Sequence, residues 1–221
     1  MTAKPDALLP RIESEVRELL RSLPHCHGWD HTSRVRALAR RLAGEEGADV
    51  TVVEFAALLH DVGRAAEFAT KGENCHAEVG AAMVPRLLRE LGIDDPDFVA
   101  HVTACVRSHR YRRKNGLVPS TIEARVVYDA DKLDSIGAIG VGRAFHFAGR
   151  VGARVHNTEQ EALSAGEYSL QDTAYREYLV KLRNLREAML TASGRRLAAA
   201  RHAFMEQFFA RLDAEVAGRD G

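Results

Sequence analysis

The chain has 221 residues, of which 46% are hydrophobic and 28% charged, enough for an apolar core beneath a solvated surface. Thirty-one basic residues balance thirty-one acidic ones, and a net charge of +0 excludes a global basic field for holding nucleic acid. The apolar runs are too short and too interrupted for a membrane span, and the first residues lack the pattern of a signal peptide.

Hydrophobic residues recur with a helical period along the whole chain, and no strand pattern of any length competes. The first helix is expected at about 13–23, before Pro24. Further helices are expected at roughly 30–43, 50–63, 75–91, 96–109, 121–135, 137–149, 171–190 and 194–217, with loops at 65–74, 111–120 and 151–169. The segment 50–63, which Asp49 or Thr51 can cap, is apolar on nearly every side and is expected to be a central buried helix.

These elements predict an all-α fold and one domain over 1–221, with a core of about 20–150 and C-terminal helices of about 170–217 packed on it. Three cysteines, Cys26, Cys75 and Cys105, form no C-x-x-C pair, so we expect no disulfide framework, inert thiols and a cytoplasmic location.

Polar residues interrupt the apolar faces of three expected helices. His31 lies four residues before Val35, His60 and Asp61 end the most apolar helix, and Asp131 lies four residues after Val127. Ionisable side chains that face a core are costly unless they are paired or bind a metal. Taken singly, each is more often an ordinary core or surface residue, but together they could surround one cation.

An acidic trio, Asp129, Asp131 and Asp134, belongs to the helix expected at 121–135. Asp129 and Asp131 point to opposite sides of a helix, so only one of them is expected to look inward, while Asp131 and Asp134 share a side.

Five motifs occur in order: H-G-W-D-H-T-S-R-V (27–35), L-L-H-D-V-G-R (58–64), H-A-E-V-G-A (76–81), S-H-R (108–110) and Y-D-A-D-K-L-D-S-I-G-A-I-G (128–140). This pattern resembles the HD-domain metal-dependent phosphohydrolase superfamily, and most of all its small stand-alone branch with a D-A-D-K/R-L-D-A-x-G-A-I-G segment. The resemblance covers the chain from about residue 20 and implies a compact all-helical HD bundle. The commonest form of the branch has Asp where Gly28 stands here.

The resemblance implies four metal ligands, which are His31, His60, Asp61 and Asp131. Two imidazoles and two carboxylates leave about two positions of an octahedral shell open for water and a phosphate oxygen. Such ligands suit Mn, Fe, Co or Ni, with Mg or Zn as further options. The cation would lower the pKa of its bound water, so no protein nucleophile is required.

Histidines of the family in places comparable to His76 and His109 bind a second metal, contact phosphate or donate a proton; the alternative is a pair of surface histidines. Asp61 could bridge two ions. With only two further histidines the second ion would depend on water and substrate, so we expect one tightly held metal.

Other residues beside the motifs are assigned to the substrate or to supporting roles. His27 is expected to support the ligands or face the substrate, Asp30 to cap its helix and Asp134 to hold a substrate hydroxyl or support the ligands. The candidate phosphate partners are Arg34, Arg64, Arg110, Lys132 and Lys181.

The function implied by the resemblance is metal-dependent hydrolysis of a small phosphorylated metabolite, with a nucleotide favoured. We expect no nucleic-acid partner and no membrane partner, and a homodimer is compatible with the sequence. The alternatives are a cyclic-dinucleotide or (p)ppGpp-type hydrolase, a non-catalytic nucleotide sensor or scaffold with the same fold, and a helical nucleic-acid-binding domain, which the zero net charge disfavours.

Overall fold

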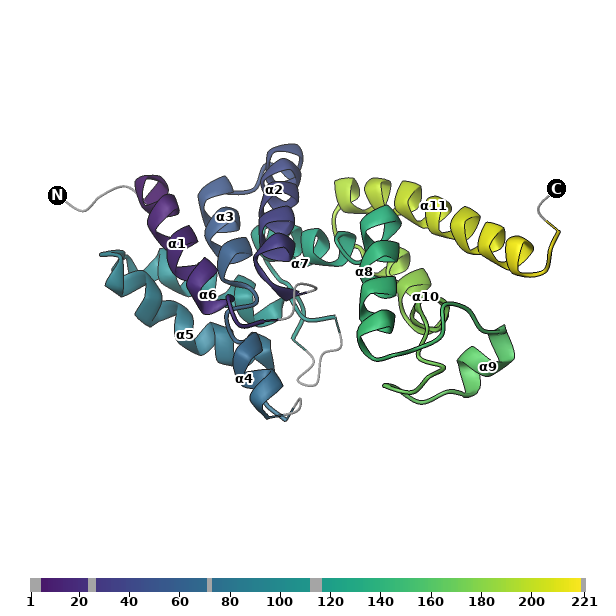
Figure 1. Cartoon of the computed structure of the whole chain (residues 1–221). Helices are drawn as coiled ribbons and strands as arrows, with labels where there is room; N and C mark the ends of the chain where they lie inside the picture. Colours follow the sequence, from purple (N-terminus) through teal and green to yellow (C-terminus); the bar gives the residue numbers. More distant parts are fainter. Residues whose placement is uncertain (1–4, 24–26, 71–72, 112–116, 220–221) are drawn as a thin grey trace. The chain divides into compact units, whose positions relative to one another are not determined.

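The protein is all-α, as predicted, over the residues that the computed structural model describes, which are 5–23, 27–70, 73–111 and 117–219 (Figure 1). These ranges contain no strand. His25 and Cys26 lie outside the described residues. None of the helices within the described ranges has both the length and the apolar character needed to cross a bilayer. The cytoplasmic location stays a prediction.

The chain divides into two compact units, Met1–Asp131 and Lys132–Gly221. The first contains η1 (Pro5–Leu8), α1 (Leu9–Leu19), α2 (Trp29–Glu46), α3 (Val50–Leu59), α4 (Arg64–Ala69), α5 (His76–Glu90), α6 (Pro96–Ser108) and most of α7 (Ile122–Leu133). The second contains α8 (Gly137–Arg150), α9 (Glu159–Ser164), α10 (Ala174–Val180), η3 (Leu182–Asn184), η4 (Arg186–Ala188) and α11 (Ala192–Val216). The expectation of a single domain stays a prediction.

Helix α3 is the centre of the first unit. It packs against α1, α2 and α6, and every residue from Val52 to Leu59 is buried. The ring of Phe55 meets that of Phe98 edge-on at 5.4 Å. Asp49 begins the helix, because its Oδ1 accepts hydrogen bonds from the backbone N–H groups of Thr51 and Val52. The prediction of a central buried helix at this position is therefore confirmed.

The turn after α3 touches the start of α5 directly. Gly63 lies so close to this helix that a Cβ atom there would be 2.2 Å from the backbone oxygen of His76 and 2.6 Å from the backbone nitrogen of Gly80. Only a glycine permits this approach, so the end of α3 and the first turn of α5 are fixed to each other by backbone contact.

The second unit has its own apolar contacts. Helix α8 packs against α10 and α11, and α9 packs against α10. The ring of Tyr178 stacks on that of Phe209 with centroids 4.5 Å apart, which joins α10 to α11.

Two segments expected to be loops contain short helices. Helix α4 covers the first half of 65–74, and α9 lies within 151–169. Thr158 and Glu161 form a capping box for α9, a T-x-x-E signal that the sequence interpretation passed over.

The helix expected at 171–190 is interrupted instead of continuous. After α10 the backbone leaves helical values at Lys181, and the short 3₁₀ turns η3 and η4 follow. Leu179, Leu182 and Leu185 are all buried at a spacing of three, which matches a 3₁₀ turn and which periodicity alone did not separate from an α-helix.

Two further boundaries differ from expectation. Helix α1 begins at Leu9 and ends at Leu19, earlier than predicted at both ends, because Pro10 is well tolerated in a first turn. Asp30 does not cap α2. The cap position is Gly28, and Asp30 lies in the first turn, where its charge favours the helix dipole.

Candidate metal centre

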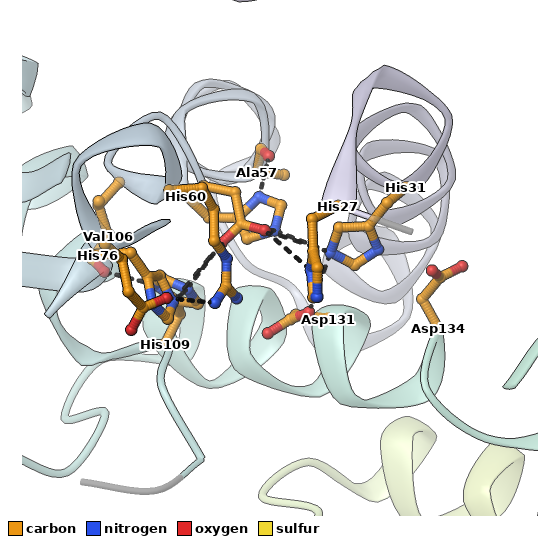
Figure 2. A network of polar contacts seen from close by, with 12 residues as sticks. His27, His31, Ala57, His60, His76, Val106, His109, Asp131 and Asp134 are labelled. Atoms are coloured by element: carbon orange, nitrogen blue, oxygen red, sulfur yellow. Dashed lines mark hydrogen bonds and ion pairs between the residues drawn. The ribbon is translucent and has the colours of Figure 1, made fainter. Parts of the chain in front are cut away.

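Six buried side chains converge inside the first unit, and each stands near the end of a helix. His31 lies in the first turn of α2, His60 and Asp61 follow α3, His76 begins α5, His109 follows α6, and Asp131 lies in the last turn of α7. The most exposed of them, Asp131, shows only 6% of its surface. Figure 2 shows the labelled histidines and Asp131 pointing toward one another from these elements.

Three of these residues form what we call the first donor group, His31, His60 and Asp131. The Nε2 atom of His31 lies 3.3 Å from His60 Nε2 and 3.3 Å from Asp131 Oδ1. Two donors that each bind one ion at about 2.1 Å are roughly 3–4 Å apart when they take neighbouring positions around it. The spacing of the first donor group therefore fits one cation.

The second donor group consists of Asp61, His76 and His109. The Nε2 atoms of its two histidines are 3.2 Å apart, and each lies 3.6 Å from Asp61 Oδ1. The other oxygen of the same carboxylate, Oδ2, lies 3.7 Å from the Nε2 atoms of His31 and His60. Asp61 therefore faces one donor group with each of its oxygens.

Asp61 Oδ2 is a buried oxygen with no hydrogen-bond donor among the described residues. A buried carboxylate oxygen left in this way is costly unless another partner satisfies it. The Nε2 atoms of His31 and His60 lie 3.7 Å from Asp61 Oδ2, and a neutral imidazole nitrogen that carries no proton is a hydrogen-bond acceptor and a metal donor. A cation among these atoms would satisfy all of them at once, so the residues present fit a metal ion.

Hydrogen bonds on the far side of three rings set their orientation. The Nδ1–H groups of His60 and His109 donate to the carbonyl oxygens of Ala57 at 2.7 Å and Val106 at 2.6 Å (Figure 2). His76 Nδ1 donates to Glu67 Oε2 at 2.8 Å. Because carbonyls and carboxylates only accept, Nδ1 carries the proton in each ring, and Nε2 presents its lone pair to the donor groups.

Burial keeps two of these histidines neutral. It lowers the pKa of His60 to about 4, and it lowers the pKa of His76 to about 4 despite the opposing influence of Glu67. Burial alone would raise the pKa of Asp61, but the charge of Arg64 and the neighbouring histidines hold it well below its usual range. Near neutral pH, His60, His76 and Asp61 are thus in the protonation states that bind metal.

An arginine and a glutamate of α4 lie beside the second donor group. Arg64 donates from Nε to Asp61 Oδ1 at 3.0 Å and from Nη1 to Glu67 Oε2 at 2.8 Å. Arg110 Nη1 forms an ion pair with Glu67 Oε1 at 3.2 Å. Burial would raise the pKa of Glu67, but His76, Arg64 and Arg110 lower it to about 2. The sequence interpretation missed Glu67 because α4 was expected to be a loop.

Two aromatic rings lie at the exposed edge of the site. His27 Nδ1 is 4.0 Å from Asp61 Oδ2, and its ring centroid is 6.1 Å from that of His31. The ring of Phe68, which is 44% exposed, lies 6.2 Å from that of His27. His27 is therefore close to the donor groups, as expected from its motif, and Phe68 is an addition that the motifs did not indicate.

Asp129 is also fully buried, so burial does not distinguish it from Asp131. Both faces of α7 are covered, as the burial of Val126 and Tyr128 shows. What distinguishes the two aspartates is that Asp131 belongs to a donor group.

The remaining candidates are placed less specifically. Arg34 is half-buried on α2. The second unit contains Lys132, which is buried, Asp134, whose carboxylate accepts from Arg143 at 2.9 Å, and Lys181, which forms an ion pair with Glu177. Their substrate-binding roles stay predictions.

The chain is similar to several known proteins. The family model of the HD domain matches residues 28–136. The chain is 34% identical to Bacillus subtilis YpgQ over 210 residues, which cover 95% of this chain and 94% of that protein. A crystal structure of YpgQ in complex with ADP superposes with a TM-score of 0.74 at 31% identity, covering both chains completely.

Two other similarities bear on the chemistry. An HD-superfamily hydrolase from Bacillus thuringiensis has a TM-score of 0.73 at 28% identity, with 97% of this chain and 99% of that chain covered. Ribonuclease Y of Treponema pallidum is 32% identical over 156 residues, which cover 70% of this chain and only 27% of that protein.

Proposed function

Because this chain belongs to the HD-domain superfamily, we propose that it is a metal-dependent phosphohydrolase that acts on a small phosphorylated metabolite, with a nucleotide as the leading substrate class. The observation that carries the proposal is Asp61, a buried carboxylate that faces two groups of metal-type donors and has one oxygen without a hydrogen bond.

The donor atoms suggest that two ions are held with unequal strength. His31, His60, Asp131 and Asp61 Oδ2 give the first ion four donors, whereas Asp61 Oδ1, His76 and His109 give the second ion three. Arg64 already donates to Asp61 Oδ1, and its charge opposes a second cation there. One tightly held ion and one weaker ion follow, with Mn, Fe, Co or Ni favoured by mixed nitrogen and oxygen donors.

A bound ion would withdraw charge from a phosphoryl oxygen and would lower the pKa of a water molecule, so that hydroxide is available as the nucleophile near neutral pH. The protein residues hold the reactants. Arg64 and Arg110 lie beside the second donor group, and each is partly exposed, so each can reach a phosphate oxygen with its planar fork.

Two observations support a nucleotide as the substrate. YpgQ, which matches the chain over its whole length, has been crystallised with ADP. In this chain, the ring of His27 lies beside the donor groups and the exposed ring of Phe68 lies 6.2 Å from it, so both offer flat surfaces for stacking. A purine or pyrimidine stacked on such a ring gains about 1–3 kcal/mol.

A second candidate function is hydrolysis of a phosphodiester in RNA, which the similarity to ribonuclease Y favours. The chain spans only about a quarter of that enzyme, and its net charge of +0 provides no general attraction for a polyanion. We therefore include RNA in the test as a competitor.

The test combines metal analysis with a screen that identifies products. Purified protein is analysed for bound metal and then incubated with Mn²⁺, Co²⁺ or Ni²⁺ and with AMP, ADP, ATP, a cyclic dinucleotide or a short RNA. Chromatography separates orthophosphate, pyrophosphate and nucleoside products, and so identifies the bond that breaks. His60→Ala and Asp61→Ala are expected to abolish turnover and to lose metal, while His146→Ala, at an exposed histidine of α8, serves as the control.

Turnover that is equal in wild-type protein and in the His60→Ala variant would refute the metal-site assignment. Cleavage of RNA without cleavage of any mononucleotide would replace the leading function with the second. Tight metal and nucleotide binding without turnover of any substrate would identify a sensor instead of an enzyme.

A further inference from the structure

Glu67 receives three cationic or polar donors although it belongs to neither donor group. His76 Nδ1 donates to its Oε2 at 2.8 Å, Arg64 Nη1 donates to the same oxygen at 2.8 Å, and Arg110 Nη1 pairs with Oε1 at 3.2 Å. The side chain is only 12% exposed. The Glu67 carboxylate thus connects His76 of α5 to Arg64 and Arg110.

We propose that Glu67 is a positioning residue of the second donor group: it fixes the tautomer and orientation of His76 and holds Arg64 and Arg110 beside it. The proposal rests on the proposed function, because it assigns a metal to that group. It predicts that the affinity for the second ion depends on Glu67, whereas the affinity for the first ion does not.

The three oriented rings show why His76 needs this contact. The Nδ1–H groups of His60 and His109 donate to carbonyl oxygens three residues earlier in their own helices, so the fold of each helix orients the ring. His76 is the first residue of α5 and has no preceding turn to supply such a carbonyl. Glu67 takes that place, and a carboxylate holds the N–H more strongly than a carbonyl and makes Nε2 a better ligand.

Glu67 also affects the second donor group through Arg64. It donates to both Asp61 Oδ1 and Glu67 Oε2, so its charge is shared between two carboxylates. Without Glu67, Arg64 would keep Asp61 as its main anionic partner and would compete more strongly with a cation for Oδ1. Loss of Glu67 therefore weakens the second ion through the ligand His76 and through the ligand Asp61.

The first donor group provides an internal control. No described contact of Glu67 involves His31, His60 or Asp131. A defect confined to one of two donor groups that share Asp61 would be difficult to explain by general loss of structure.

The experiment titrates the metal-free full chain with Mn²⁺ by calorimetry, without substrate, in wild-type protein and in the Glu67→Ala and Glu67→Gln variants. The second, weaker binding step is expected to fall about 10–100-fold in affinity in Glu67→Ala, and less in Glu67→Gln, whose amide oxygen still accepts from His76. The first step should change less than about twofold. Glu78→Gln is the matched control, since Glu78 lies two residues from His76 on α5 and pairs with the half-exposed Arg107.

The tautomer of His76 is a second measurement that does not require metal. Long-range ¹H–¹⁵N spectra of the metal-free protein should show the proton on Nδ1 in wild-type protein and in the control, and a mixture of tautomers in Glu67→Ala. Thermal unfolding of each variant reports whether the fold is retained, and Glu67→Gln remains informative if the alanine variant does not fold.

The proposal would be overturned if Glu67→Ala bound both ions with wild-type affinity, or if both steps weakened equally together with the melting temperature. An unchanged His76 tautomer would overturn it as well. Failure of the proposed function would look different, because wild-type protein would then bind metal and release no product from any substrate.

Discussion

Gly63 connects the metal centre to the packing of the fold, and replacing it with alanine tests that connection. The added Cβ would lie 2.2 Å from His76 O and 2.6 Å from Gly80 N, whereas nonbonded heavy atoms prefer about 3.5 Å. Both obstacles are backbone atoms, so no side chain can rotate away. The turn after Asp61 and the first turn of α5 must separate by roughly 1 Å.

The cost of this separation follows from measured effects of overpacking. Forcing one extra methyl group into a packed region costs about 1–3 kcal/mol, and the upper part of that range applies where backbone has to move. For a chain of this length each kcal/mol corresponds to about 2–4 °C in melting temperature, so Gly63→Ala should melt about 5–10 °C lower. Because the movement displaces His76 from Asp61, the second ion should also bind at least about tenfold more weakly.

Gly44→Ala is the matched control. Gly44 lies inside α2, where a Cβ would meet no atom within 4 Å, and alanine is about 0.5–1 kcal/mol better than glycine within a helix. The same chemical change should therefore raise the melting temperature there and leave both metal-binding steps unaltered. Calorimetric melting and Mn²⁺ titration measure both effects. A Gly63→Ala protein as stable as wild-type, with an unchanged second step, would refute the argument.

Three further predictions concern the site. Asp131→Asn should lose the tight metal on dialysis while Asp129→Asn keeps it; retention by the first and loss by the second would show that the donor is the other aspartate. Because burial lowers the pKa of His60 and His76 from 6.5 to about 4, the unfolded chain binds up to two more protons between these values. The metal-free protein should therefore become less stable as pH falls from 6.5 to 4, and thermal unfolding across that range checks the sign. Phe68→Ala should raise KM for ATP about 5–100-fold and leave that for inorganic tripolyphosphate unchanged, and equal effects on both would exclude stacking.

The parts of the fold that the sequence predicts are those with strong local signals. The largely apolar segment from Val52 to Leu59 and the cap at Asp49 specify α3 almost completely, because a helix that is buried on all sides consists mainly of apolar residues. The segment after Leu179 was misjudged because leucines at a spacing of three satisfy a 3₁₀ turn and an α-helix alike. Local periodicity therefore predicts the burial of a residue better than it predicts the backbone conformation at that residue.

Glu67 shows why part of the site could not be predicted. Its contact with His76 spans nine residues and depends on α4 forming and on the close approach of Gly63 to α5. Neither condition leaves a periodic pattern, and no family motif that the sequence interpretation used contains Glu67. A polar ligand that interrupts an apolar helix face can be recognised in the sequence, whereas a carboxylate on a short polar helix resembles its polar neighbours.

The two donor groups also explain the His-Asp pair itself. The side chains of adjacent residues in a helix point about 100° apart. The side chains of His60 and Asp61, which directly follow a helix, also point in different directions. Because α3 ends at Leu59, both residues of the pair lie just beyond it. The His60 ring belongs to the first donor group, while the Asp61 carboxylate faces one group with each of its oxygens. Gly63 then allows the first turn of α5, which begins with His76, to approach the turn that carries Asp61. The pair serves two groups because it stands where the buried helix α3 stops, and the close approach of α5 at that point leaves no room for a side chain at position 63.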